Sequence, residues 1–109
     1  MYIPEQGDIV SLDFDPSAGK EIMKRRPAFV ISRKIFNDHT GFAVVAPITS
    51  TLRGNAMEVE LPASLDTGGA VVIYQIKSLD FEERKIRFIE KSPESTVDKV
   101  LERAKLIVS

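Results

Sequence analysis

The chain has 109 residues, a formal net charge of −1 and no cysteine. Its length suits one domain with a modest core, so a single domain over residues 1–109 is predicted. Without cysteine there is neither a disulfide framework nor a thiolate metal site. The near-zero charge excludes a generic binder of polyanions, so any surface for nucleic acid has to be local.

The N-terminal residues show no targeting signal. Residues 1–5 lack the basic and apolar stretches of a signal peptide, and no apolar run approaches the length of a membrane span. We therefore expect a soluble, cytoplasmic protein with no membrane partner.

The first half of the chain reads as strands joined by loops. Residues 9–14 alternate apolar and polar residues, which predicts a half-buried strand. A long loop punctuated by Pro and Gly follows over residues 15–27. Residues 28–31 form a near-continuous apolar run, which indicates a central strand. Residues 35–41 resemble a short helical turn ended by glycine, and residues 42–48 form another strand.

The second half continues in the same way. After a loop at 51–55, alternation over 57–61 predicts a strand with one wet face, and 66–69 is a turn. Further strands are expected at 70–74 and 86–89, with residues 75–80 following the first of them. The residues expected in the core are Phe29, Val30, Val44, Val45, Val71 and Ile73.

The chain ends in a predicted helix. Ser92 is a candidate N-cap, and Pro93 suits the first helical position. Apolar residues recur after it at three- and four-residue spacing and give one stripe, made of Val97, Val100, Leu101, Ala104, Ile107 and Val108. Short strands at close spacing followed by one helix predict a mainly β fold, a compact barrel-like sheet closed by the C-terminal helix.

The long loop over residues 15–27 carries the residue types of a functional site. Most hairpin loops are much shorter, and one of this length is usually functional or disordered. Glu21 supplies a proton acceptor, and Arg26 supplies a planar cation suited to a phosphate. Pro27 biases Arg26 towards extended backbone, where the loop re-enters a strand. The alternative interpretation is an ordinary solvated charged loop.

Seven short motifs then follow one another in a distinctive order. They are GDIV at 7–10, DFDP at 13–16, GKE at 19–21, RPA at 26–28, APITS at 46–50, GAVV at 69–72 and QIKSLD at 75–80. Together they resemble the MazF/PemK/Kid toxin family, whose long loop follows a pattern close to P-x-x-G-x-E-Q-x-G-x-R-P. The resemblance spans almost the whole chain, including the terminal helix.

The resemblance implies both a fold and an activity. The fold is an SH3-like barrel with a long loop between its first two strands and a C-terminal helix. The activity is that of a sequence-specific, metal-independent endoribonuclease toxin of a type II toxin–antitoxin system, without a cofactor. Its implied partners are single-stranded RNA or mRNA, a second copy in a homodimer, and a MazE-like antitoxin with an acidic tail. The basic stretch over residues 20–34 offers charge complementary to such a tail.

The chain departs from the family pattern at four positions. Ile22 stands where the family has Gln after the Glu, and Lys24 stands where it has Gly. On the strand before the family's Gln, some members carry Arg and Asp where this chain has Val72 and Tyr74. Glu21, Arg26 and Thr49 are kept.

Metal-free RNA cleavage sets chemical requirements of its own. When the RNA 2′-hydroxyl attacks the adjacent phosphorus, it needs a base, an acid for the leaving oxygen, and donors for the phosphoryl oxygens. The products are a 2′,3′-cyclic phosphate and a 5′-hydroxyl. The only histidine, His39, lies in a turn and is expected to be a surface residue. The catalytic candidates that the resemblance picks out are Glu21, Arg26 and Thr49.

Nine further residues are candidates for RNA binding. Lys24, Arg25 and Arg53 suit the RNA backbone. The loop residues Ser17, Ser50 and Thr51 suit base edges. Tyr74 either stacks on a base or packs inside the barrel. Two more, Gln75 and Lys77, match family positions that line the dimer groove.

Two other functions fit the same kind of barrel. One is a CcdB-like topoisomerase poison, but that resemblance rests on a Trp-containing C-terminal tip and this chain has no Trp. The other is a non-catalytic SH3-like interaction domain. The presence of Glu21, Arg26 and Thr49 favours the ribonuclease over both.

Overall fold

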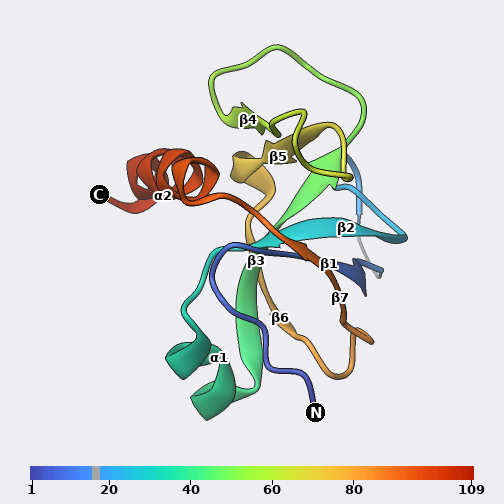
Figure 1. Ribbon diagram of the computed structural model, residues 1–109. Coiled ribbons are helices and arrows are strands. Elements are labelled where there is room, and N and C mark those ends of the chain that lie inside the picture. The colour runs from blue at the N-terminus through green and yellow to red at the C-terminus, as the bar shows by residue number, and fades with distance from the viewer. Residues whose placement is uncertain (16–17) are drawn as a thin grey trace.

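Figure 1 shows the computed structural model, which describes residues 1–15 and 18–109. One antiparallel sheet carries most of the chain, and one long helix lies across it. The strands are β1 (Asp8–Asp13), β2 (Arg25–Val30), β3 (Phe42–Thr49), β4 (Glu58–Glu60), β5 (Ala70–Val72), β6 (Lys77–Asp80) and β7 (Arg87–Lys91). The helices are α1 (Lys34–Thr40), the 3₁₀ turn η1 (Ile73–Gln75) and α2 (Glu94–Val108).

Strand β3 organises the sheet. It pairs with β2 along one edge, and its other edge pairs first with β6 and then with β5. The complete order is β4-β5-β3-β2-β1-β7, with β6 beside β3. Within the described residues the end strands β4 and β7 do not pair with each other. The mainly β fold with a C-terminal helix is therefore confirmed, whereas the closed SH3-like barrel is not seen.

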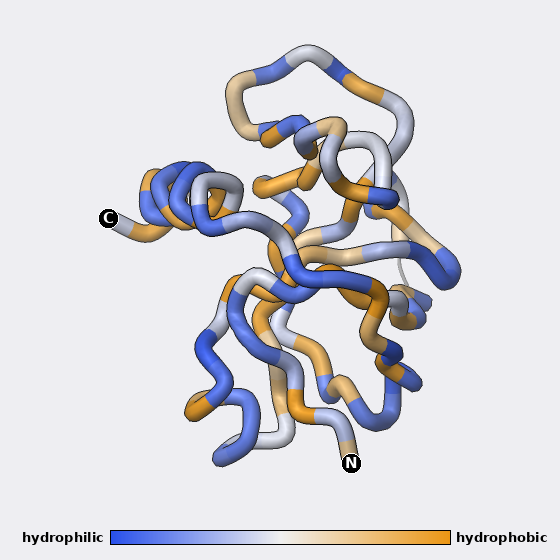
Figure 2. Tube along the Cα trace, viewed as in Figure 1, coloured by the Kyte–Doolittle hydropathy of each residue, from blue (hydrophilic) through white to orange (hydrophobic). Residues whose placement is uncertain are grey.

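The sheet buries both of its faces. Its buried apolar side chains form two clusters, one on each face, because successive side chains of a strand point to opposite faces. Figure 2 shows the hydrophobic stretches in the central strands. One face carries Ile9, Phe29, Ala46, Ile48 and Val71, which cluster with Ile73 of η1 and Val100 of α2. The other face is curled inward and includes Val10, Leu12, Phe14, Ala28, Val30, Ala43, Val45 and Leu79.

Strand β2 begins earlier than predicted. The loop was expected to run to residue 27, but Arg25, Arg26 and Pro27 already pair with β1, in the register Ser11↔Pro27 to Asp13↔Arg25. The charged residues and the proline hid the start of this strand. As a result Arg26 lies within a strand and not in the loop.

The strand predicted at 70–74 is also shorter than expected. Only Ala70–Val72 pair with neighbouring strands, and Ile73–Gln75 form a 3₁₀ turn whose hydrogen bond runs from the Ile76 N–H to the Ile73 carbonyl. This turn redirects the chain between β5 and β6, which lie one after the other along β3.

The start of α2 differs from the prediction at Ser92 and Pro93. Pro93 is the N-cap residue and the helix begins at Glu94, so Pro93 is not the first helical residue. Ser92 does not cap the helix, because its buried hydroxyl and its backbone N–H both donate to the Gly7 carbonyl. The predicted apolar stripe packs on the sheet as far as Ala104, whereas the last residues of the helix are exposed. No helix in the described part of the chain is long and apolar enough to cross a membrane.

Candidate active site at the ends of the central strands

The strand register sets Arg26 and Thr49 at the same end of adjacent strands. Strands β2 and β3 pair as Ala28↔Pro47, Phe29↔Ala46 and Val30↔Val45. Arg26 lies two residues before Ala28 and Thr49 two residues after Pro47, so both lie at the same end of these antiparallel strands. Alternation then places both side chains on the inward face, at the same end of two adjacent strands. Two of the three predicted catalytic residues therefore share one face at one end of adjacent strands.

Thr49 is held firmly at the end of β3. It is 6% exposed, and its Oγ1 accepts a hydrogen bond from the Thr51 N–H at 3.1 Å. Gly69 passes so close that a Cβ at that position would lie 2.2 Å from the Thr49 carbonyl oxygen. A hydroxyl that accepts one hydrogen bond still has its own proton to donate. Thr49 can therefore offer that proton to a phosphoryl oxygen.

Arg26 presents a largely uncommitted guanidinium. Its Nε donates to the Met23 carbonyl at 3.1 Å, which fixes the direction of the side chain. Among the described residues no carboxylate lies within ion-pair distance of Arg26. The two terminal nitrogens can thus bind a phosphate in the forked geometry that arginine favours.

Glu21 is held by the loop and by β6. Its Oε1 accepts the Ala18 N–H at 2.8 Å and lies 3.7 Å from Lys77 Nζ. The carboxylate is nearly half exposed, so the Lys77 pair is screened by water and contributes little to stability. Lys77 pairs with Val45, which places it on the same inward face as Arg26 and Thr49. The carboxylate and the strand residues therefore share one side of the sheet.

The loop departures from the family pattern have clear structural consequences. The Ile22 side chain is buried, and its N–H donates to Gln75 Oε1 at 2.7 Å. Lys24 adopts a left-handed backbone with φ of +70°, a conformation that costs a residue with a side chain about 1–2 kcal/mol. Its N–H donates to Asp15 Oδ1 at 3.0 Å, and its carbonyl accepts from the Phe14 N–H at 3.0 Å. The base of the loop is therefore closed despite the missing glycine.

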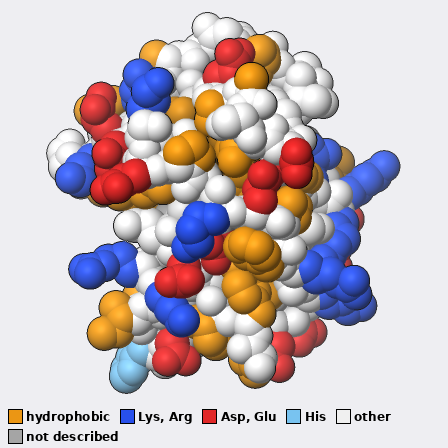
Figure 3. Space-filling view, viewed as in Figure 1, with side chains coloured by type: hydrophobic (Ala, Val, Ile, Leu, Met, Phe, Trp, Pro, Cys, Tyr) orange, Lys and Arg blue, Asp and Glu red, His pale blue; other side chains and the backbone are white. Residues whose placement is uncertain are grey.

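Arg25 lies on the opposite face from Arg26. Its guanidinium donates to the Lys85 carbonyl at 2.7 Å and to the Ser11 carbonyl at 3.3 Å, and lies 3.5 Å from Asp13. The Arg84 side chain donates to the backbone carbonyls of Asp13 and Asp15, so two guanidinium groups from distant segments bind the backbone at and just after the end of β1. Figure 3 shows basic side chains gathered along this side of the molecule. Arg84 and Lys85 were not predicted, since nothing in the sequence links them to Arg25.

Four further residues predicted to bind RNA follow the ends of β3 and β5. Ser50, Thr51 and Arg53 are exposed in the loop after β3. Its shape depends on Glu58, whose carboxylate accepts the N–H groups of Arg53 and of the following glycine at 3.0 Å. Tyr74 is 44% exposed, so the alternative of burial inside the barrel is wrong.

The other three residues predicted to bind RNA are Ser17, Gln75 and Lys77. Ser17 lies outside the described residues. Gln75 and Lys77, predicted to line a groove, contact the loop residues Ile22 and Glu21 instead. Their binding of RNA stays a prediction.

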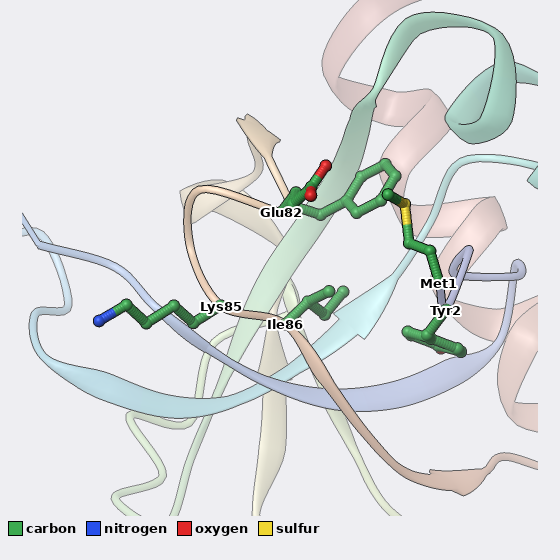
Figure 4. A pocket seen from close by; sticks show the side chains of 6 residues that line it. Met1, Tyr2, Glu82, Lys85 and Ile86 are labelled. Atoms are coloured by element: carbon green, nitrogen blue, oxygen red, sulfur yellow. The ribbon is translucent and has the colours of Figure 1, made fainter.

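A small hollow lies elsewhere. Figure 4 shows it between the N-terminal residues and the turn after β6, with Tyr2 and Ile86 among its lining residues. Its volume is about 120 Å³, and none of the predicted site residues lines it. Over the described residues, no group of three or more His, Asp or Glu side chains is placed to hold a metal ion.

Comparison with known proteins identifies the class of this chain. Residues 5–108 match the family described as PemK-like, MazF-like toxin of type II toxin–antitoxin systems. The chain belongs to this family, and the predicted resemblance is confirmed.

Individual relatives agree with the family. The endoribonuclease toxin MazF of Escherichia coli (strain K12) is 35% identical over 83 residues, 76% of this chain and 74% of that protein. A crystal structure of MazF from Deinococcus radiodurans superposes with a TM-score of 0.94 at 34% identity, and covers 99% of this chain and 98% of that chain. A MazE–MazF crystal structure from the same organism gives a TM-score of 0.86 at 30% identity, with 100% of this chain and 98% of that chain covered.

Proposed function

We propose that this endoribonuclease toxin cuts single-stranded RNA at specific sequences, with the RNA 2′-hydroxyl as the nucleophile. The observation that carries the proposal is the position of Arg26 and Thr49 at one end of adjacent strands, on one face, with the Glu21 carboxylate on the same side. A phosphate bound beside Arg26 and Thr49 would accept hydrogen bonds from a guanidinium and a hydroxyl. Such fixed donors stabilise the charge that develops on the phosphoryl oxygens.

Each chemical requirement has a residue to meet it. Glu21 takes the proton of the 2′-hydroxyl while the 2′-oxygen forms a bond to phosphorus. The bond between phosphorus and the 5′-oxygen then breaks. The leaving oxygen takes a proton from Arg26 or from a water that Arg26 orients. Because the guanidinium holds its proton strongly, charge stabilisation is its main role. Thr49 donates to a non-bridging oxygen from a rigid strand end. The nucleophile belongs to the substrate, so no metal is needed to generate it.

The proposed partners follow from the relatives. The Deinococcus structures include MazE–MazF complexes, which supports an antitoxin partner for this chain. We expect a MazE-like antitoxin whose acidic tail competes with RNA for the basic side chains near the loop. A homodimer would supply the long groove such a tail needs. Cytoplasmic mRNA is the proposed target.

End mapping on a long single-stranded RNA in excess chelator tests the proposal. The expected products carry 2′,3′-cyclic phosphate and 5′-hydroxyl ends, at a short recurring sequence. Ends that carry a 5′-phosphate, or activity that disappears with chelator and returns with Mg²⁺, would contradict it.

A further inference from the structure

The loop that carries Glu21 is docked on one distant segment of the chain. Ile22 is 7% exposed, whereas its neighbour Met23 is 44% exposed, so the loop turns one apolar side chain inward. The Ile22 N–H donates to Gln75 Oε1 at 2.7 Å, and Glu21 lies 3.7 Å from Lys77 Nζ. Both contacts reach the same three-residue stretch, more than fifty residues away in sequence.

The two contacts fix the loop to different degrees. The Glu21–Lys77 pair joins two flexible side chains at a partly exposed site, so it sets the position of the carboxylate only loosely. The Gln75 contact joins a side-chain carbonyl to a backbone N–H, which fixes the chain itself one residue from Glu21. A part-buried hydrogen bond of this kind leaves a buried N–H without a partner if it is lost.

We propose that Gln75 is a positioning residue for RNA cleavage, because its amide carbonyl clips the Ile22 N–H and so holds Glu21 in reach of the phosphate bound at Arg26 and Thr49. This inference rests on the proposed function. It also gives Gln75 a different role from the RNA contact that the sequence predicted. The Gln75 side-chain carbonyl already accepts the Ile22 N–H, and Gln75 ends η1 two residues before β6 begins at Lys77.

The physical reason for such a clip is the freedom of a loop. The chain leaves β1 at Asp13 and re-enters the sheet at Arg25, so Glu21 has no strand partner of its own. A misplaced catalytic group lowers the reaction rate steeply, since catalysis depends on the geometry of the reacting atoms. One well-placed acceptor that reaches the backbone beside Glu21 narrows that freedom without touching the substrate.

Three variants separate this role from RNA contact. In Gln75→Ala the acceptor is lost, whereas Gln75→Glu keeps an oxygen acceptor and adds a negative charge that RNA would repel. Gln6→Ala is the matched control, since the Gln6 amide also bonds a backbone group, the Ile31 carbonyl at 2.8 Å, but outside the loop. Thermal unfolding of each variant reports whether the fold is kept.

The first readout is amide hydrogen exchange at Ile22, measured by NMR without RNA. We expect exchange at least about tenfold faster in Gln75→Ala, and within about threefold of wild type in Gln75→Glu and Gln6→Ala. Unchanged exchange in Gln75→Ala would disprove the clip, whether or not the protein cuts RNA. A wild-type protein that fails to cut RNA, with the exchange pattern as expected, would instead count against the proposed function alone.

The second readout is steady-state cleavage of a short RNA. Gln75→Ala should lower kcat about tenfold with KM within twofold, and Gln75→Glu should restore kcat to within about threefold of wild type. If Gln75 bound RNA, KM would rise, the cleavage sequence would change, and Gln75→Glu would be the most damaged variant. Faster exchange with unchanged kcat would show that the Gln75–Ile22 hydrogen bond exists in the wild type but does not position Glu21 for catalysis.

Discussion

The candidate site has two halves that are built differently. Arg26 and Thr49 belong to adjacent strands, so sheet register sets their positions. Glu21 belongs to a loop, and its position depends on side-chain contacts from Gln75 and Lys77. Changes in the strand half should therefore slow the chemical step directly, whereas changes in the loop half should lower the fraction of molecules in which the site is assembled.

The largest effect is expected from Arg26→Ala. Loss of the main donor to the phosphoryl oxygens should lower cleavage about a hundredfold or more, which corresponds to about 2.7 kcal/mol. Thermal stability should change little, since the terminal nitrogens of Arg26 have no protein partner among the described residues. Arg33→Ala, at an exposed arginine before α1, is the control and should stay within twofold. Cleavage by Arg26→Ala within threefold of wild type would remove Arg26 from the mechanism.

The next largest effect is expected from Gly69→Ala, a substitution beside the Thr49 backbone. In Gly69→Ala a methyl group would meet the Thr49 carbonyl, at a backbone φ of +108° that suits only glycine. We expect a loss of about 2–3 kcal/mol in the free energy of unfolding, measured with urea. Gly68→Ala is the neighbouring control, because a Cβ there meets nothing within 4 Å. Equal stability of the two variants would show that Thr49 is not braced as described.

Thr49 itself should matter less than Arg26. Removing its hydroxyl in Thr49→Ala is expected to lower kcat about tenfold, or about 1.4 kcal/mol, since one neutral donor is lost. In Thr49→Ser the hydroxyl remains and activity should stay within about threefold. A Thr49→Ser variant as inactive as Thr49→Ala would assign the effect to strand packing and not to the hydroxyl.

The smallest effect is expected in the loop. Lys24→Gly restores the residue that the family pattern has at this left-handed position. The relieved backbone strain exceeds the added freedom of the unfolded chain, so the free energy of unfolding should rise by about 0.5–1 kcal/mol. Lys20→Gly, at a loop position without a positive φ, should give no such gain. A loss of stability in Lys24→Gly would mean that the lysine side chain itself holds the loop.

The fold was largely predictable because apolar periodicity is local information. Gly41 ends α1 with a φ of +77°, and the strand with one wet face is β4, as the alternation predicted. The start of β2 was missed because Arg25 and Arg26 are charged, although β1 pairs with both. Ser92 was misread because a serine before a helix usually caps it, and here its hydroxyl donates a hydrogen bond to the distant Gly7 carbonyl.

The site was predictable only as a set of residue types. The family motifs point to Glu21, Arg26 and Thr49 in the sequence, and the register explains why Arg26 and Thr49 share one end of the sheet. The contact between Ile22 and Gln75 could not be predicted, since it joins a backbone N–H to a side chain across the fold. The bonds from Arg25 to the Lys85 carbonyl and from Arg84 to the Asp13 carbonyl are of the same kind.

The central claim is that the RNA supplies its own nucleophile to a phosphate held at Arg26 and Thr49. Its most direct test is a short RNA that carries a single 2′-deoxyribose immediately 5′ of the mapped cut, compared with the unmodified RNA. The account predicts that the wild-type protein binds both strands with similar affinity and cuts only the unmodified one. Cleavage of the deoxy-substituted RNA at the same position would contradict attack by the 2′-hydroxyl.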